Sequence, residues 1–384
     1  MVDSFMAGSG AVFCCRCGKS SCRRPKPPSW RRIQGIMKKT ALQTITLKIL
    51  TAAMAIFGAS ILSFVFLRLA PGDPAGLVLG PFATDAARAR LTAEMGIDKP
   101  VPAQYLTYMH ELLSGNWGYS YSIGQSVLEL FASRLPATLE LGFSALLFAF
   151  VSALILSLVK TYTKRRLVKN TINVFCYGAY SMPQFFLGIL LLIVFSTGLG
   201  VFPGPEGRTR FPSYSLPRIT GFLIPDSLIA ADFPLLLDAL WHLVLPSVTL
   251  GLYSMAFLAR ILGANLSSSY REKYITVSLS HGITDWQALV RHALPNALVT
   301  SATAAAVLVG ILMTGTMLVE TVFAWPGIGS LITSSIQKQD FSVVQAFIFF
   351  SAFVFVVCNL VIELLITKID PRLGIHAVKG SGDE

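Results

Sequence analysis

Residues 137–159 read ATLELGFSALLFAFVSALILSLV, and Glu140 is the only charged residue among them. A bilayer core about 30 Å thick is spanned by about 20 predominantly apolar helical residues. The apolar residues here run continuously, whereas a strand of a membrane barrel alternates apolar and polar residues. The stretch therefore predicts a transmembrane helix.

Five other stretches of similar length have the same apolar character. They are 47–67, 171–197, 240–262, 301–321 and 343–367. Of the 384 residues, 53% are hydrophobic and only 13% are charged, whereas about 25% are charged in soluble domains. This composition excludes a disordered chain and disfavours a soluble globule. We expect an all-α, polytopic membrane protein with six transmembrane helices.

The net charge of +11 comes from 31 basic and 20 acidic residues. Such an excess can indicate nucleic-acid binding, but in membrane proteins Lys and Arg collect in cytoplasmic segments. Residues 1–46, 160–170, 260–300 and 368–384 together hold 21 Lys and Arg residues, against nine in the opposite loops. Both termini are therefore predicted to be cytoplasmic, with membrane lipids as partners and no nucleic acid.

The segments outside the spans differ in length and composition. We expect a basic cytoplasmic tail at 1–46, an external loop or small domain at 68–136, a cytoplasmic loop at 263–300 and a short tail at 375–384. The first tail contains four cysteines, but no His or second Cys pair follows at zinc-finger spacing. Either this tail is disordered or translation begins at Met37, so that residues 1–36 are absent from the native protein.

The cytoplasmic loop contains a segment, 274–295, that has more order in its sequence than a plain connector. Gly282 is suited to end one helix, and Thr284 or Asp285 can cap the next. Pro295 disfavours a helical conformation at Leu294 and is expected to close the segment. These signals predict a short helix between Gly282 and Pro295.

An apolar stripe at helical spacing runs along this short helix. It consists of Trp286, Leu289, Val290 and Ala293. A short amphipathic helix in the cytoplasm either lies on the membrane or docks into a groove of another protein. Because Arg291 is its one basic residue, docking is favoured, although packing against the chain's own helices would also explain the stripe.

The 274–295 segment resembles the coupling loop of permeases of ATP-binding-cassette importers. The acidic residue that is common at the start of that loop is absent here, and His292 stands where Ile is usual. Both departures are similar to the oligopeptide/dipeptide/nickel branch, as are six motifs in order along 47–374. The motifs are Leu69-Ala-Pro-Gly-Asp-Pro74, Ser114-Gly-Asn-Trp-Gly118, Leu135-Pro-Ala-Thr-Leu-Glu140, Met182-Pro-Gln-Phe-Phe-Leu-Gly188, Glu320-Thr-Val-Phe-Ala-Trp-Pro-Gly-Ile-Gly329 and Asn359 to Asp370-Pro-Arg372.

The resemblance implies a type I importer architecture in a bacterial inner membrane and a function in alternating access. It implies four partners: a second permease, two cytoplasmic ATPases and an external binding protein. ATP and magnesium would be bound by the ATPases, since this sequence has no phosphate-binding loop. The chain would then bind no cofactor or metal and would not itself be an enzyme.

The resemblance also implies which residues couple the permease to its ATPases. They are Ser278, His281, Gly282, Trp286, Leu289, Val290, His292, Leu294 and Pro295. Residues around a predicted kink at Pro183 are candidates to line the transport pathway, although ordinary helix packing would also explain them. They are Met182, Pro183, Phe185 and Phe186.

Short peptides are the expected cargo, with nickel chelates or other small solutes as alternatives. A stand-alone secondary transporter is a further alternative, but it would need coupling groups at mid-membrane and often internal repeats. Three acidic residues, Glu140, Glu320 and Glu363, lie close to span ends, where we expect them to stay hydrated and to serve structural roles.

Overall fold

The computed structural model describes residues 30–69, 100–120, 122–210 and 219–369, together with residues 84 and 86. For residues 30–45, 66–69, 303, 306, 309–315 and 362–369 it describes the backbone alone. The chain divides into two compact units, residues 1–46 and 47–384. The predicted cysteine-containing tail lies largely outside the described residues, and the second unit contains all six predicted spans.

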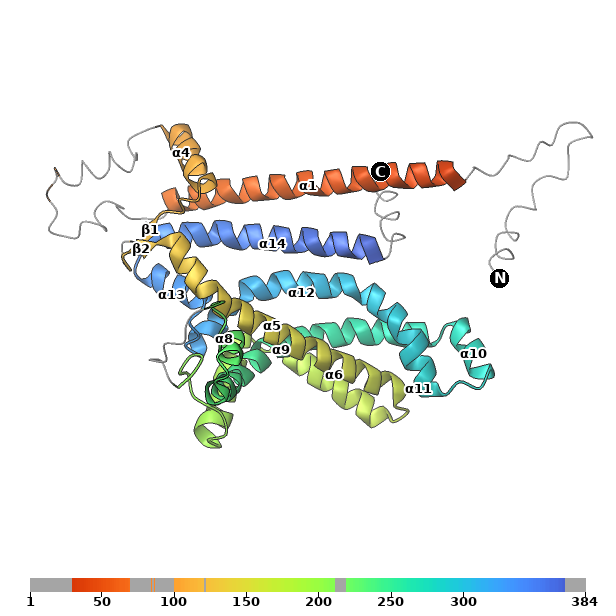
Figure 1. Cartoon of the computed structure of the whole chain (residues 1–384). Helices are drawn as coiled ribbons and strands as arrows, with labels where there is room; N and C mark the ends of the chain where they lie inside the picture. Colours follow the sequence, from red (N-terminus) through yellow and green to blue (C-terminus); the bar gives the residue numbers. More distant parts are fainter. Residues whose placement is uncertain are drawn as a thin grey trace, which may run out of the picture. The chain divides into compact units, whose positions relative to one another are not determined.

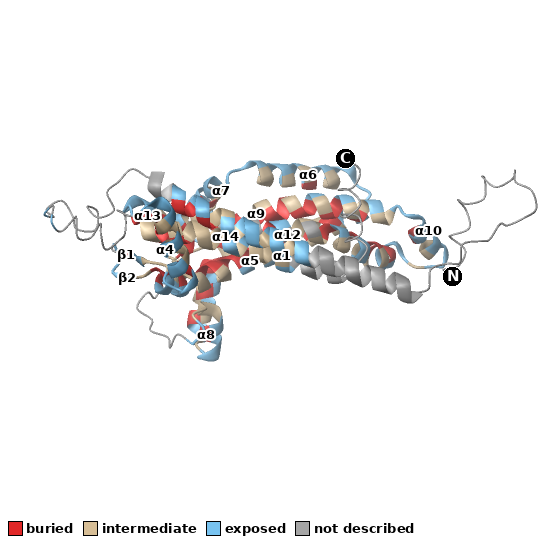
Figure 2. Cartoon of the chain, turned by 90° about the horizontal axis from the view of Figure 1, so that it is seen from above, coloured by how far each residue is buried: buried red, intermediate tan, exposed pale blue. Residues whose placement is uncertain are grey.

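Two long helices, α5 (Val127–Tyr162) and α9 (Phe233–Tyr270), form the central pair of the fold (Figure 1). They run in the same direction, since Ser144 contacts Ser247 at 2.6 Å and Ser157 donates to the Ala259 carbonyl at 3.2 Å. Small residues allow this close approach: a Cβ added to Gly251 would lie 2.8 Å from the Ala145 carbonyl oxygen. Buried positions accordingly follow α5 and α9 along their lengths (Figure 2).

The remaining helices pack around this pair. α12 (Leu294–Val322) lies on α9, α14 (Phe341–Ile369) lies on α12, and α13 (Ile328–Gln337) contacts α12, α14 and α5. Within the second unit, α1 (Trp30–Leu69) is tied to α4 (Val101–Leu113) by hydrogen bonds between Ser60 and Tyr105 and between Ser63 and Tyr108.

The described residues contain four helices that are long and apolar enough to cross a membrane. They lie in α1, α5, α9 and α14. They cover the predicted spans 137–159 and 240–262 in full and most of 47–67 and 343–367. The predicted span 301–321 lies within α12, but several of its side chains are outside the described residues. The protein is thus mostly helical, with four or five candidate spans by this measure.

The predicted third span, 171–197, is not one kinked helix. α6 (Arg166–Ser181) and α7 (Gln184–Leu191), which continues as a π-helical turn at Leu192–Gly198, meet at 107°. Proline lacks a backbone N–H and clashes with the preceding turn. At Pro183 this ends α6 altogether, since Met182 has extended backbone angles. The segment is a broken span or a re-entrant loop.

One end of the α5–α9 pair carries a small hairpin and two short helices (Figure 1). The strands β1 (Tyr119–Ser120) and β2 (Gln125–Ser126) pair antiparallel, a small exception to the predicted all-α class. Asp340, just before α14, accepts hydrogen bonds from Ser120 at 2.6 Å and from Ser122 at 2.7 Å. The hairpin is thereby fixed to the start of α14.

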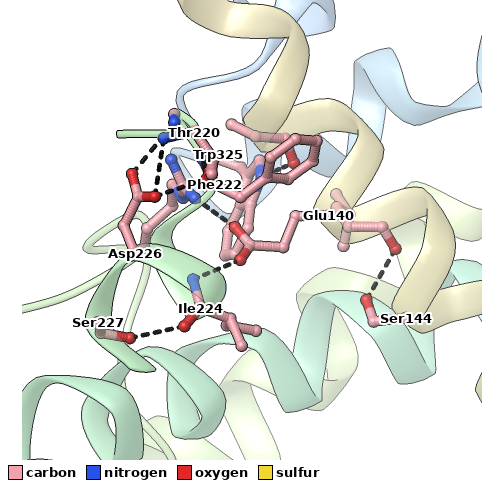
Figure 3. A network of polar contacts seen from close by, with 12 residues as sticks. Glu140, Ser144, Thr220, Phe222, Ile224, Asp226, Ser227 and Trp325 are labelled. Carbon is pink, nitrogen blue, oxygen red and sulfur yellow. Dashed lines mark hydrogen bonds and ion pairs between the residues drawn. The ribbon is translucent and has the colours of Figure 1, made fainter. Parts of the chain in front are cut away.

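At the same end, Glu140 joins α5 to the segment that precedes α9 (Figure 3). Its carboxylate pairs with the Arg208 guanidinium and accepts a hydrogen bond from the backbone N–H of Ile224 at 2.8 Å. Ile224 lies in α8 (Leu223–Ile229). Glu140 is therefore a structural anchor, as expected from its position close to a span end.

Asp226 organises the first turn of α8 (Figure 3). Its carboxylate accepts hydrogen bonds from the Thr220 hydroxyl at 2.5 Å, the Thr220 N–H at 2.9 Å and the Gly221 N–H at 3.1 Å. Burial raises the pKa of the Asp226 carboxyl, but these hydrogen bonds outweigh burial, so its pKa lies below the usual value.

Glu320 has the structural role that we expected, but it is not hydrated. Its side chain is fully buried and accepts hydrogen bonds from the Thr138 hydroxyl at 2.8 Å and the Ser330 N–H at 2.9 Å. Thr138 in turn accepts from the Ile328 N–H at 2.8 Å. Glu320 thus fixes the turn between α12 and α13 against α5. The side chain of Glu363 is outside the described residues.

Candidate functional site

The candidate site is the segment between α9 and α12, at the end of α9 opposite the hairpin (Figure 1). A first short helix, α10 (Lys273–Ser280), follows α9 and ends where the sequence predicted. Gly282 has φ +86°, in the left-handed region that favours glycine, and its N–H donates to the Leu279 carbonyl at 3.0 Å. A Cβ at this position would meet no atom within 4 Å, so the requirement for glycine is conformational rather than steric.

Thr284 begins the second short helix, α11 (Asp285–Gln287), as one of the two predicted caps. Its hydroxyl accepts from the Gln287 N–H at 3.3 Å, and the Gln287 side chain accepts from the Thr284 N–H at 3.4 Å. This capping box satisfies N–H groups that otherwise lack partners at a helix start.

Pro295 does not close the segment, which corrects the sequence prediction. α11 continues through a π-helical turn, Ala288–Ala293, into α12, and Leu294 has helical angles of φ −61° and ψ −46°. Pro295 sits in the first turn of α12, where its missing N–H breaks no hydrogen bond within that helix. A π-helical turn is wider than an α-helical turn and lies just before Pro295. The helical path therefore continues past the proline into α12.

One face of this segment is buried against the chain's own helices. Leu289 is 1% exposed, and it packs with Ile275 of α10 and with Leu262 and Leu266 of α9. For Leu289 the structure therefore supports packing against the chain's own helices, which was the alternative to docking on another protein. Ala293 is also fully buried. These residues fix the segment as one body with the end of α9.

Aromatic and polar contacts hold the segment on three sides. The Trp286 ring meets the ring of Tyr162, at the end of α5, edge to face with centroids 5.4 Å apart. The Tyr270 hydroxyl, at the end of α9, donates to the Asp285 carboxylate at 3.2 Å. The Asn296 amide in α12 donates to the Tyr274 hydroxyl at 3.0 Å. Any force on the segment is thus carried to α5, α9 and α12.

Apolar side chains remain exposed on the outer face of the segment. Trp286 is 48% exposed, and Val277 and Tyr274 on α10 are 56% and 38% exposed. Sequence analysis missed Tyr274 and Val277, although their spacing of three residues places them on one helix face. Three exposed apolar groups on a rigid, capped segment form a surface suited to another protein.

Comparison with known proteins identifies the kind of chain to which this segment belongs. Residues 145–375 match the sequence model of a family described as "Binding-protein-dependent transport system inner membrane component". Residues 41–142 match the model for the N-terminal part of the membrane component of such a system. The chain belongs to this family. The resemblance drawn from the six motifs and the loop is confirmed.

Relatives of this permease match over nearly their whole length. The probable D,D-dipeptide transport system permease protein DdpB of Escherichia coli K12 is 34% identical over 86% of this chain and 96% of its own. The di/tripeptide transport system permease protein DppB of Pseudomonas aeruginosa is 34% identical over 83% of this chain and 94% of its own. A solved amino acid ABC transporter chain is 16% identical over 64% of this permease and 94% of its own length, with a TM-score of 0.42.

The other predicted coupling residues of the permease lie along the same segment. His281 and Gly282 are exposed in the turn after α10, and His281 Nδ1 lies 2.7 Å from the Val277 carbonyl oxygen. Ser278 is half-buried and donates to the Tyr274 carbonyl at 2.9 Å. Three of the remaining four are half-buried: Val290, His292 and Leu294. Pro295 is exposed.

The predicted pathway residues of the permease lie where α6 meets α7. Pro183 is exposed at the break, and Met182, Phe185 and Phe186 are 42%, 42% and 46% exposed. Gly188, one turn further along α7, is buried, and an added Cβ would lie 3.2 Å from side-chain atoms of Thr249 and Phe323. α7 thus packs closely through Gly188 and leaves the Phe185 side exposed.

Proposed function

We propose that this permease is the membrane subunit of an ATP-driven, binding-protein-dependent importer of short peptides. The observation that carries the proposal is the match to relatives named as dipeptide and di/tripeptide permeases over nearly their whole length. Sequence identity of this extent across all the spans supports a shared transport path as well as a shared fold.

The proposed complex contains a second permease, two cytoplasmic ATPases and an external substrate-binding protein in a bacterial inner membrane. This chain contributes six spans with both termini in the cytoplasm, as its distribution of Lys and Arg supports. ATP and magnesium bind to the ATPases, which carry out the hydrolysis.

The segment from α10 to the start of α12 is the proposed contact with one ATPase. Its outer face offers Tyr274, Val277 and Trp286, and its inner face is buried against α9. Because the inner face and the three side contacts hold it firmly, a shift of the ATPase moves the ends of α5, α9 and α12 together. Such a shift would favour one of two states in alternating access.

The predicted coupling residues divide into two roles in this proposal. Trp286 and His281 are exposed and contact the ATPase, whereas Leu289 acts indirectly by holding the helix on α9. Gly282 and Pro295 shape the backbone. The half-buried residues Ser278, Val290, His292 and Leu294 support the exposed ones.

The exposed residues at the α6–α7 break are proposed to line the path between the two permeases. Met182, Phe185 and Phe186 present apolar and aromatic surface there, which suits peptides of varied side chains. A small residue at Phe186, as in Phe186→Ala, should alter which dipeptides are transported while ATPase assembly is unchanged.

Purification of tagged protein from native membranes tests the docking surface. We expect wild-type protein to retain the second permease and the ATPases, and Trp286→Ala to lose the ATPases alone. Trp241→Ala is the matched control, because Trp241 has a similar exposure of 42% and lies in the first part of α9, away from the segment. Retention of the ATPases by Trp286→Ala, with normal uptake of a labelled dipeptide, would contradict the docking proposal.

A second measurement separates the cargo from the coupling. Cells that depend on this importer should take up a labelled dipeptide, and unlabelled dipeptides should compete. Competition by a nickel chelate and not by dipeptides would overturn the cargo and leave the importer class intact. Uptake without any associated ATPase would instead indicate a secondary transporter.

A further inference from the structure

A groove lies between α5, α6 and α9 and extends along α6 to Tyr180, two residues before Met182. Its lining includes no residue of the docking segment. Two cations line it: Lys160 in the last turn of α5 and Arg260 in α9. Polar groups from α6 line the opposite wall, among them Asn173, Tyr177 and Tyr180. No acidic residue is among the lining residues of this groove in the described part of the chain.

Arg260 has aromatic neighbours but no carboxylate partner among the described residues. Its guanidinium lies 5.0 Å from the centre of the Tyr180 ring and 5.9 Å from that of Phe257. None of the ion pairs among the described residues involves Arg260. A planar guanidinium presents several N–H donors that suit phosphate oxygens. A cation within a helix long enough to span the bilayer is a candidate functional residue.

The chain next to the groove is strongly basic. Residues 160–170 contain five Lys and Arg residues and no Asp or Glu, and three of them, Lys164, Arg165 and Arg166, are exposed around the start of α6. Clusters of this kind beside a transmembrane helix attract anionic lipid headgroups. The positive potential therefore extends from the groove to its outer edge.

Exposed apolar side chains accompany the basic groups on α6. Leu167, Val174 and Phe175 are 82%, 71% and 50% exposed, and residues seven and eight apart lie on one side of a helix. Figure 2 shows α6 as a largely exposed helix. At about 100° per residue these three side chains lie on the face of α6 opposite the one that Asn173, Tyr177 and Tyr180 present to the groove. Lipid tails around α6 would cover them outside the groove.

We propose that this groove binds an anionic phospholipid of the surrounding membrane. The headgroup phosphate lies between Lys160 and Arg260, with Asn173 and Tyr177 as hydrogen-bond donors, and the acyl chains leave the groove into the surrounding membrane. The site requires only that the chain is embedded in a membrane, and it does not depend on the cargo or on the docking surface.

Binding of phosphatidylglycerol to the purified full-length protein in detergent tests the site, with phosphatidylcholine for comparison. Each Lys or Arg near an anionic lipid surface contributes about a fivefold change in affinity. We expect phosphatidylglycerol to bind wild-type protein at least fivefold more tightly than phosphatidylcholine does, and Arg260→Gln to abolish most of this preference. Arg260→Lys keeps the charge and should keep most of the preference.

Arg271→Gln is the matched control, because Arg271 is an exposed Arg directly after α9 that does not line the groove. It should bind phosphatidylglycerol like wild type. If Arg260→Gln does not fold, Lys160→Gln tests the other half of the headgroup site and should lose a similar factor. Equal binding of the two lipids would overturn the proposal. Displacement of phosphatidylglycerol by equimolar inorganic phosphate, or by a dipeptide, would also overturn it and would assign the groove to a small anion or to the cargo.

Discussion

Replacing Gly282 by alanine tests whether the shape of the turn between α10 and α11 is needed for coupling. Gly282 has φ +86°, and an added Cβ would meet no atom within 4 Å. The substitution therefore adds no clash, and its whole cost is the strain of an L-residue in the left-handed region, about 1–2 kcal/mol. This is equivalent to a factor of about 5–30 against the native turn.

The turn can release this strain by opening, because Gly282 is exposed and nothing encloses it. Opening would rotate the α10 face, with Tyr274 and Val277, relative to Trp286. We expect Gly282→Ala to lower dipeptide uptake at least fivefold and to reduce stimulation of the partner ATPases. Gly282→Asn should lie within about twofold of wild type, since Asn tolerates the left-handed region. Gly282→Asp should abolish transport while the protein still inserts.

Gly200 provides the matched control for this strain. It also has a positive φ, +62°, and an added Cβ there would also meet no atom within 4 Å, but it follows the π-helical turn after α7. Gly200→Ala should cost a similar amount of stability and leave coupling unchanged. Wild-type uptake by Gly282→Ala, or an equal loss in both alanine variants, would refute the reasoning.

Two further predictions concern stability and are read from thermal unfolding in detergent. Gly251→Ala should lower the melting temperature strongly, because its Cβ would lie 2.6 Å from Phe148 Cδ1 and 2.8 Å from a backbone carbonyl oxygen of α5. Gly263→Ala is the control and should leave the melting temperature nearly unchanged, because the nearest atom to its Cβ would be 3.7 Å away. Similar losses in the two variants would argue against the tight α5–α9 packing. The pKa of Asp226 in the folded protein lies below its ordinary value of 3.8. Its carboxylate therefore adds stability above pH 3.8, and this gain is lost as the pH falls through the lower folded pKa. Asp226→Asn should remove this pH dependence, and an unchanged acid unfolding profile in the variant would contradict the prediction.

Much of the local structure could be predicted because its causes lie within a few residues. The Thr284 cap and the termination at Gly282 depend on backbone N–H groups and angles of the same short segment. Continuous apolar runs predicted helices at the right places. At Pro183 a kink was predicted, but the helix breaks there. At Pro295 the end of a helix was predicted, but the helix continues. The two predictions were wrong because the effect of a proline depends on whether the surrounding turns can adapt.

The sequence by itself determined the family, the apolar helices and the cap of the short helix that follows Gly282, because hydrophobic runs and capping signals act over short range. Only the tertiary structure decided which side of each helix is covered. It placed Leu289 against α9 and left Trp286 exposed, and it brought Lys160 and Arg260 to one groove. These outcomes depend on contacts between residues that are tens of positions apart, such as Leu289 with Leu266, or about a hundred apart, such as Ser157 with Ala259. No local pattern encodes such spacings.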